Sequence, residues 1–559
     1  MFRRLTYIHL AILIALLGAC TTNQSPQPPP LDPQSRAQSD PKKKTVFVRA
    51  WTPPDKRLVT LGYVGDLPIR PELPNEPAFN TESYDHLEEN PFLSVEVNPL
   101  STFSIDVDTA SYANVRRFIT EGKLPPRDAV RLEELINYFD YDYLPPSGGD
   151  PFSVTVEVGE CPWAGEHRLA RIGLKAQVML QKDRPPANLV FLLDVSGSMQ
   201  SGNKLPLVKK SMRMLLGGLN TDDTVAIVVY AGAAGLVLPA TPVSDREMIL
   251  GALEQLEAGG STAGGAGIQL AYNVARENLI PGGTNRVVLA TDGDFNVGTS
   301  DRGSLIRLVQ DEAKSGVFLT VLGFGMGNLK DDMLDSLADK GNGNYAYIDG
   351  LFEARKVLMD QVGATLVTIA KDVKIQVEFN PAQVGAYRLI GYENRMLRAE
   401  DFNDDKKDAG EIGAGHTVTA LYELVPADSD YSGPTVDPLK YQEGRTVSSE
   451  AGSGELLTVK VRYKEPDGVE SQLISFPVTD PGTDFTVASA DFKFAAAVAS
   501  FGMILRESEH RGDSSWDSVL SLAEEGLGDD RKGYRSGFLD LVAAARDISP
   551  ERTASLEEQ

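Results

Sequence analysis

Between about residues 187 and 367, apolar stretches alternate with amphipathic ones, and this pattern constrains the fold more than any other feature of the chain. The predicted strands are 188–193, 224–230, 286–290 and 317–324, and the predicted helices are 205–219, 246–257, 266–279, 303–315 and 352–366. Strands that are apolar at every position are buried on both faces, so they belong to a parallel sheet that helices cover on both sides. The sequence therefore predicts an α/β domain with a mostly parallel, Rossmann-like sheet.

Three loops of this segment carry oxygen-bearing side chains. The first loop follows a predicted strand and holds Asp194, Ser196 and Ser198. The second loop holds Thr262 just before a predicted helix, and in the third loop Asp292 directly follows another strand. The carboxyl ends of neighbouring parallel strands meet at one edge of the sheet, where open α/β sheets bind ligands. Two carboxylates and three hydroxyls suit a hard divalent cation, above all Mg²⁺, with Mn²⁺ and Ca²⁺ as alternatives. Because hydroxyls do not neutralise the ion, the metal would keep a position open for a further carboxylate.

These five residues resemble the metal-ion-dependent adhesion site of von Willebrand factor type A domains, the family that includes integrin I domains. The resemblance implies that the serines and the threonine contact the metal directly or through water, and that the aspartates often bind through water. It also implies a protein partner that donates a carboxylate to the metal. In that family, metal occupancy is coupled to movement of the last helix, which corresponds here to residues 351–366.

The flanking segments resemble a narrower family. Residues 98–118, 131–139 and 492–498 are similar to YfbK-like bacterial lipoproteins that contain a von Willebrand factor type A domain. The similarity covers most of residues 95–548. It leaves the function open, because that family is largely uncharacterised.

The N-terminus indicates the compartment. Arg3 and Arg4 precede an apolar run at 8–17, which is too short to span a bilayer and ends in Leu-Gly-Ala before Cys20. This arrangement resembles the lipobox of bacterial lipoproteins, so residues 1–19 are expected to be a signal peptide and Cys20 to be lipidated. An ordinary secretory signal with a chance cysteine is the alternative.

Lipidation would place the protein in the cell envelope. Thr21 is not the Asp that retains enterobacterial lipoproteins in the inner membrane, which favours the outer membrane in a Gram-negative cell. No later stretch is apolar over the roughly 18 residues of a membrane-spanning helix, so the N-terminal lipid is the expected membrane contact.

The rest of the chain divides by composition and periodicity. Strands at 152–159 and 168–179 resemble in length and polarity the alternating strands beyond about 370, which predicts a β-sandwich into which the α/β domain is inserted. The predicted segments are a lipid-anchored, Pro-rich tether at 20–95, an N-terminal module of helices then strands at 96–186, the von Willebrand factor type A domain at 187–367, a β-rich domain at 368–482, a helical segment at 483–549 and a disordered tail at 550–559.

An enzyme is not expected, because the chain has no Gly-x-Ser-x-Gly elbow, Walker loop or paired-histidine zinc motif. The alternative is a Mg²⁺-dependent phosphatase, since Asp106 and Asp108 follow a strand as in haloacid dehalogenases, with one as nucleophile and the other as acid/base. Against it, Ala110 stands where that family has Thr or Val, and no parallel strands surround residue 106. The preferred interpretation has Asp108 or Thr109 capping the following helix.

The net charge of −25 repels phosphate backbones and excludes nucleic acid as an expected partner. The leading hypothesis is therefore an envelope-anchored adhesion protein that captures a protein through the metal. A structural envelope scaffold with an unused metal site is the remaining alternative.

Overall fold

The computed structural model describes residues 81–147, 149–261, 264–293, 302–429, 440, 447–466 and 468–549, all within one compact unit of the chain. Cys20, most of the predicted tether, Thr262 and the tail at 550–559 lie outside the described residues. Within the described part of the chain, no helix is long and apolar enough to cross a membrane.

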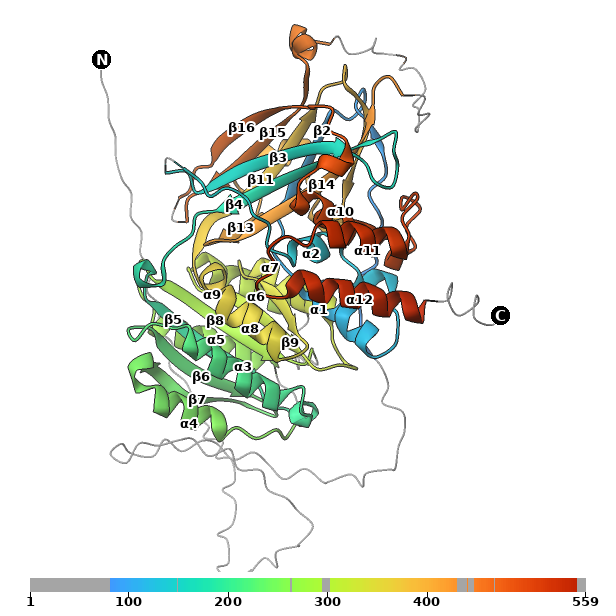
Figure 1. The fold of residues 1–559 in the computed structure, drawn as a ribbon. Coiled ribbons are helices and arrows are strands. Elements are labelled where there is room, and N and C mark those ends of the chain that lie inside the picture. Colours follow the sequence, from blue (N-terminus) through green and yellow to red (C-terminus); the bar gives the residue numbers. More distant parts are fainter. Residues whose placement is uncertain are drawn as a thin grey trace, which may run out of the picture. The chain divides into compact units, whose positions relative to one another are not determined.

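The α/β domain is built on a sheet of order β10-β9-β8-β5-β6-β7, in which neighbours pair in parallel except for β7, which is antiparallel to β6. Its strands are β5 (Ala187–Asp194), β6 (Thr224–Tyr230), β7 (Ala234–Pro242), β8 (Thr284–Thr291), β9 (Phe318–Phe324) and β10 (Tyr345–Ile348). Figure 1 shows the sheet with its helices in green to yellow. The predicted parallel sheet is confirmed.

Helices cover both faces of this sheet, and the alternation along β5 shows how. Leu189, Phe191 and Leu193 belong to the core beneath α3, α4 and the last helix, whereas Val190 and Leu192 belong to the core beneath α5, α6 and α7. The helices are α3 (Leu205–Gly217), α4 (Arg246–Glu254), α5 (Gly264–Glu277), α6 (Arg302–Lys314), α7 (Asp331–Lys340), and a last helix composed of α8 (Leu351–Arg355), a π-helical turn (Lys356–Asp360) and α9 (Val362–Leu366).

Two antiparallel sheets form the β-sandwich. One has the order β1-β12-β14-β4-β3, and the other has the order β13-β11-β15-β16 with β2 also paired to β11. The strands are β1 (Leu93–Ser94), β2 (Leu100–Ser104), β3 (Phe152–Glu160), β4 (Arg168–Ala176), β11 (Thr368–Phe379), β12 (Val384–Ile390), β13 (Gly410–Gly413), β14 (Thr417–Pro426), β15 (Glu455–Lys464) and β16 (Gln472–Thr479). Across the sandwich, the rings of Phe379 and Tyr387 stack with their centroids 3.9 Å apart.

Strands from both sides of the α/β domain pair with each other, as the sequence predicts. β4 lies beside β14 and β2 lies beside β11. The two ends of the inserted domain meet at one residue, because Thr284 donates its N–H to the carbonyl of Pro186 and its hydroxyl to the carbonyl of Leu366, both at 3.0 Å. The fold class is thereby confirmed, and the exact segment boundaries stay predictions.

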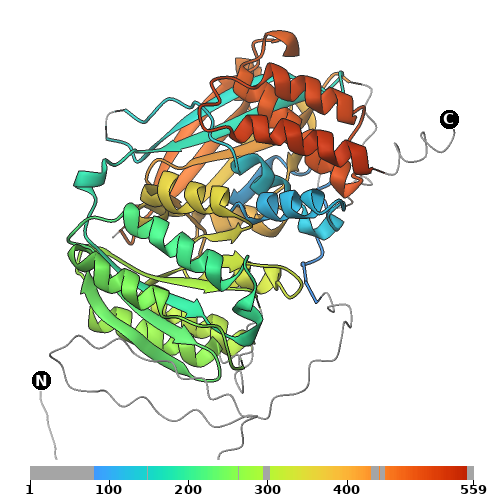
Figure 2. The same cartoon turned by 60° about the horizontal axis from the view of Figure 1, so that its bottom comes forward.

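A helical layer packs on the outer face of the first sheet. It consists of α1 (Ala110–Thr120), α2 (Leu132–Asn137), α10 (Ala490–Arg506), α11 (Trp516–Glu525) and α12 (Tyr534–Ile548). Figure 2 shows the C-terminal helices beside α1. α10 is buried along nearly its whole length rather than on one face, because it lies between α2, α11 and the sheet, where Met503 contacts Arg388 of β12.

Several elements have no counterpart in the sequence prediction. The sequence does not predict β7, β10, β13 or α7. Of these, β10 and β13 span only four residues each, and α7 is rich in aspartate. The single predicted helix at 352–366 is interrupted by the π-helical turn, where the buried ammonium of Lys356 lies 4.0 Å from the ring centre of Tyr138, the residue after α2.

Candidate metal centre

The two carboxylates of the predicted metal site lie at the same edge of the parallel sheet. Asp194 is the last residue of β5, and Asp292 directly follows β8. β5 and β8 are parallel neighbours, so their carboxyl ends coincide. Both aspartates are fully buried. The structure thus brings together charges that are far apart in the sequence.

The first loop holds Asp194 in a fixed orientation. One carboxylate oxygen accepts the N–H of Ser196 at 2.8 Å, and the other accepts the hydroxyl of Thr291 at 3.2 Å. The hydroxyls of Ser196 and Ser198 lie 3.0 Å apart, and Ser198 also hydrogen-bonds Asp292. Four of the five predicted residues therefore converge.

The second loop touches the first. Gly197 donates its N–H to the carbonyl of Gly260 at 3.0 Å, and Gly259 donates to the carbonyl of Val195 at 2.8 Å. Gly260 has a φ of +89°, which favours glycine at this close approach. The chain just before Thr262 therefore lies against the loop that carries the two serines, although Thr262 itself is outside the described residues.

The two carboxylates differ in their electrostatics. Burial raises the pKa of Asp194 to about 6, and the nearby charge of Asp292 adds to this rise. Burial also acts to raise the pKa of Asp292, but the hydrogen bond and charge of Lys204 outweigh it and hold that pKa below its usual value. Two acidic groups confined in a buried site are stabilised by a cation.

Lys204 is a residue that sequence reasoning missed. Its ammonium donates to Asp292 Oδ2 at 2.8 Å and to Asn328 Oδ1 at 3.2 Å. The lysine precedes α3, and Asn328 lies in the loop between β9 and α7. A lysine before a helix is an ordinary surface residue by sequence, so only the tertiary arrangement reveals this contact.

The Asn328 loop is fastened by the start of the described chain. Glu82 accepts the N–H of Gly327 at 2.7 Å and forms an ion pair with Arg117 of α1 at 2.9 Å. Thr81 donates its N–H to the carbonyl of Gly327 at 2.8 Å. The segment that leads in from the N-terminus therefore supports one wall of the site.

The donor set fits a hard cation. Two carboxylates and two hydroxyls converge, and the ammonium of Lys204 shows that the position beside Asp292 accommodates positive charge. In the described part of the chain, no cluster of three or more His, Cys, Asp or Glu side chains could hold a metal. A metal here would consequently depend on hydroxyl ligands as well as on the two aspartates.

Asp106 and Asp108 are engaged in structural contacts. Asp106 pairs with Arg395 at 3.0 Å, and Asp108 accepts the N–H of Tyr345 in β10 at 2.7 Å. The predicted helix cap is wrong, because neither Asp108 nor Thr109 caps α1 through its side chain. Instead, Glu134 accepts the N–H of Ser111 in the first turn of α1. The neighbouring strand β2 is antiparallel to β11, unlike the parallel strands of haloacid dehalogenases.

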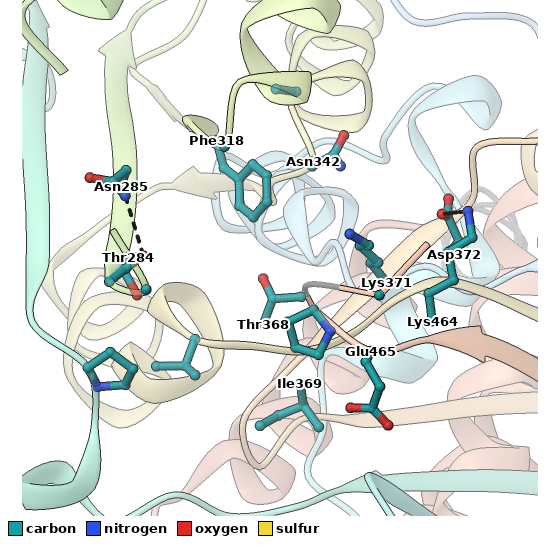
Figure 3. Close-up of a pocket in the computed structure, with 18 of the residues that line it drawn as sticks. Thr284, Asn285, Phe318, Asn342, Thr368, Ile369, Lys371, Asp372, Lys464 and Glu465 are labelled. Carbon is teal, nitrogen blue, oxygen red and sulfur yellow. Dashed lines mark hydrogen bonds and ion pairs between the residues drawn. The ribbon is translucent and has the colours of Figure 1, made fainter. Parts of the chain in front are cut away.

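A pocket of about 990 Å³ lies at the opposite edge of the parallel sheet, where β8 and β9 begin. Figure 3 shows Thr284, Asn285 and Phe318 facing residues of β11 and β15 across it. Its charged side chains include the pair Lys464 and Asp372, 2.7 Å apart. This pocket is remote from Asp194 and Asp292, so it does not belong to the candidate metal centre.

Comparison with known proteins identifies the family. Residues 364–548 match the model of the C-terminal part of the uncharacterized protein YfbK, residues 189–294 match the von Willebrand factor type A domain, and residues 78–171 match a model described as von Willebrand factor. YfbK of Escherichia coli strain K12 is 44% identical over 476 residues, which cover 84% of this chain and 82% of that protein. The chain belongs to the YfbK family.

More distant similarities cover less of this YfbK-family chain. The bovine inter-alpha-trypsin inhibitor heavy chain H3 is 28% identical over 166 residues, covering 28% of this chain and 18% of that protein. A solved structure described as von Willebrand factor type A from Catenulispora acidiphila has 15% identity and a TM-score of 0.40, and the match covers 69% of this chain and 89% of that one. The predicted resemblance to YfbK-like proteins with a von Willebrand factor type A domain is confirmed.

Proposed function

We propose that this YfbK-family protein is a non-enzymatic binding protein of the cell envelope. It captures a protein partner through a divalent cation, most simply Mg²⁺, held by Asp194, Ser196, Ser198, Thr262 and Asp292. The supporting observation is the convergence of two buried carboxylates and two hydroxyls at the ligand-binding edge of the parallel sheet. Membership of a family with a von Willebrand factor type A domain supports a role in protein interaction.

Each residue has a defined task in this proposal. Asp194 is oriented by the N–H of Ser196 and the hydroxyl of Thr291, so its carboxylate need not reorganise when a cation arrives. Ser196 and Ser198 supply uncharged oxygens. A bound divalent cation supplies the positive charge that attracts the partner's carboxylate. Asp106 is engaged by Arg395, which argues against its use as a phosphatase nucleophile.

The envelope location rests on the N-terminal sequence. Cleavage before Cys20 and lipidation of its thiol would anchor the chain, with the outer membrane favoured in a Gram-negative cell. The part of the predicted 20–95 tether that precedes residue 81 would carry the folded part away from the membrane surface, because Glu82 and strand β1 already contact the folded part.

The experiment is a thermal unfolding series of the mature chain with Mg²⁺, Mn²⁺ and Ca²⁺. Wild type should be stabilised by the metal, since binding to the folded state at 100 times Kd contributes about 2.7 kcal/mol. Asp194→Asn and Thr262→Ala should lose this stabilisation with unchanged circular dichroism. Ser201→Ala, an exposed hydroxyl in the same loop, is the matched control and should respond as wild type does.

Equal metal shifts in wild type and in both site variants would remove the basis of the proposal. If the metal binds, a pull-down from solubilised envelope with and without chelator tests for the partner. Metal binding with no metal-sensitive partner, together with altered cell shape on deletion, would favour a structural scaffold.

A further inference from the structure

Lys204 has no task in the proposed binding mechanism, yet its ammonium lies inside the candidate metal centre. We propose that Lys204 is a resident cation that compensates the buried carboxylate of Asp292 in the metal-free protein and competes with the divalent cation for it. This inference rests on the proposed metal site and adds a residue that sets its affinity.

The ammonium is directed at the site rather than at solvent. Its side chain is only 9% exposed, and its nitrogen contacts Asp292 and Asn328. Lysine side chains usually keep the charged end in water, because burying an ammonium is costly unless it is paired. The pairing with Asp292 offsets that cost, so the lysine is stable here only while the carboxylate is available to it.

The surrounding chain is shaped around the lysine. Gly325 has a φ of +72°, and a Cβ there would lie 2.3 Å from Cε and 2.5 Å from Cγ of Lys204. Only glycine therefore lets the aliphatic part of the lysine pass the loop. The hydroxyl of Tyr347 donates to the carbonyl of Gly325 and fixes this turn. The lysine thus occupies a built path and not a chance surface position.

The balance of charge explains what the lysine does. Asp194 and Asp292 contribute two negative charges if both are ionised, and Lys204 offsets one of them. A divalent cation that uses Asp292 must either displace the ammonium or bind beside it, and repulsion between like charges a few ångströms apart is strong in a buried site. A carboxylate donated by a partner would relieve this repulsion. The lysine therefore weakens the binding of metal alone and makes occupancy depend more on the partner.

The test compares Mn²⁺ binding by isothermal titration calorimetry in the mature wild type, Lys204→Met and Lys204→Arg. Methionine keeps the length of the side chain without its charge, and arginine keeps the charge. Lys210→Met is the matched control, because Lys210 is an exposed lysine on α3. Thermal unfolding of each protein in chelator provides a readout that does not depend on metal binding.

We expect Lys204→Met to bind Mn²⁺ at least about tenfold more tightly than wild type, the ratio that corresponds to a modest loss of charge repulsion. The metal-free form of Lys204→Met should unfold at a lower temperature than metal-free wild type, because Asp292 loses its counter-ion. Saturating Mn²⁺ should remove this difference in melting temperature. Lys204→Arg and Lys210→Met should bind as wild type does.

Each other outcome has a defined meaning. If wild type binds Mn²⁺ and Lys204→Met binds it equally or more weakly, the lysine only positions Asp292 and this inference fails while the metal site stands. If neither protein binds Mn²⁺, and Mg²⁺ and Ca²⁺ also leave the thermal unfolding of wild type unchanged, both the metal site and the competition are refuted. Binding by Lys204→Met alone would support the inference in its strongest form, with the lysine holding the site against the metal.

Discussion

The replacement of Arg395 by methionine should weaken the contact between the inserted domain and the sandwich. Arg395 follows β12 and pairs with Asp106 at 3.0 Å, with Asp335 at 3.2 Å and with Asp339 at 2.6 Å. Asp335 and Asp339 belong to α7 of the α/β domain, whereas Asp106 follows β2 of the sandwich. One guanidinium therefore neutralises carboxylates from both parts.

Removing one partner of a buried ion pair usually costs about 3–5 kcal/mol, because an uncompensated charge is left behind. For a domain of this size, that loss corresponds to a melting point lower by roughly 6–20 °C. Thermal unfolding measures the shift, and hydrogen exchange should show reduced protection in α7. Arg398→Met is the matched control, because the side chain of Arg398 is 74% exposed and its loss should change the melting point little.

The penalty should also depend on pH. Burial, together with neighbouring acidic groups, raises the pKa of Asp108 and of Asp335 above the usual value even with Arg395 present. An acidic group whose pKa is raised in the folded protein lowers the stability of the fold as pH rises. The difference in melting temperature between variant and wild type should therefore narrow from pH 7 to pH 5, as these groups become protonated. A melting point within 2 °C of wild type at pH 7, or a penalty that grows in acid, would refute the reasoning.

Two further predictions concern other parts of the chain. Burial raises the pKa of Glu133 to about 7, with added repulsion from Glu393 and Asp106, so this group should lower the stability of the fold as pH rises from about 4.5 to about 7. Glu133→Gln keeps an acceptor for the N–H of Tyr392 and should flatten melting temperature against pH in that window, and an unchanged slope would contradict this assignment. Cys20→Ser should move the protein from the membrane fraction to the soluble fraction of cells, and continued membrane retention would show that lipidation is not the anchor.

The sequence predicts this fold best where one physical signal dominates. The apolar runs at β5, β8 and β9 require burial on both faces, and the period of two in β11 and β14 indicates sandwich strands, so both classes of sheet could be read from periodicity. The period did not reveal that β14 is buried on both faces, because the helical layer covers the outer side of its sheet. The position of Asp194 and Asp292 at strand ends then places them at one edge without any knowledge of packing.

Residues whose role depends on distant partners could not be predicted in this way. Asp108 precedes a helix and carries a typical capping side chain, yet a backbone N–H of β10 competes successfully for its carboxylate. Lys204 and Arg395 look like surface residues in the sequence because their acidic partners come from other segments of the chain. Local pattern cannot reveal such pairings, since it contains no information about which loops meet.

The meeting of both ends of the α/β domain at Thr284 has a consequence for how the chain acquires its structure. During synthesis, β2 and the β3–β4 pair emerge before β11 and β14. β2 therefore lacks its partner β11, and β4 lacks its second neighbour β14, until the intervening domain has been made. The domain can fold first from contacts within its own sequence, and its folding brings Pro186 and Leu366 to the same residue. The long loop between the two halves of the sandwich is then already closed, so strand pairing no longer bears the entropy of closing it. A substitution that slows folding of the inserted domain should therefore leave strand edges of the sandwich unpaired and prone to aggregation, even if the substituted residue contacts no residue of the sandwich.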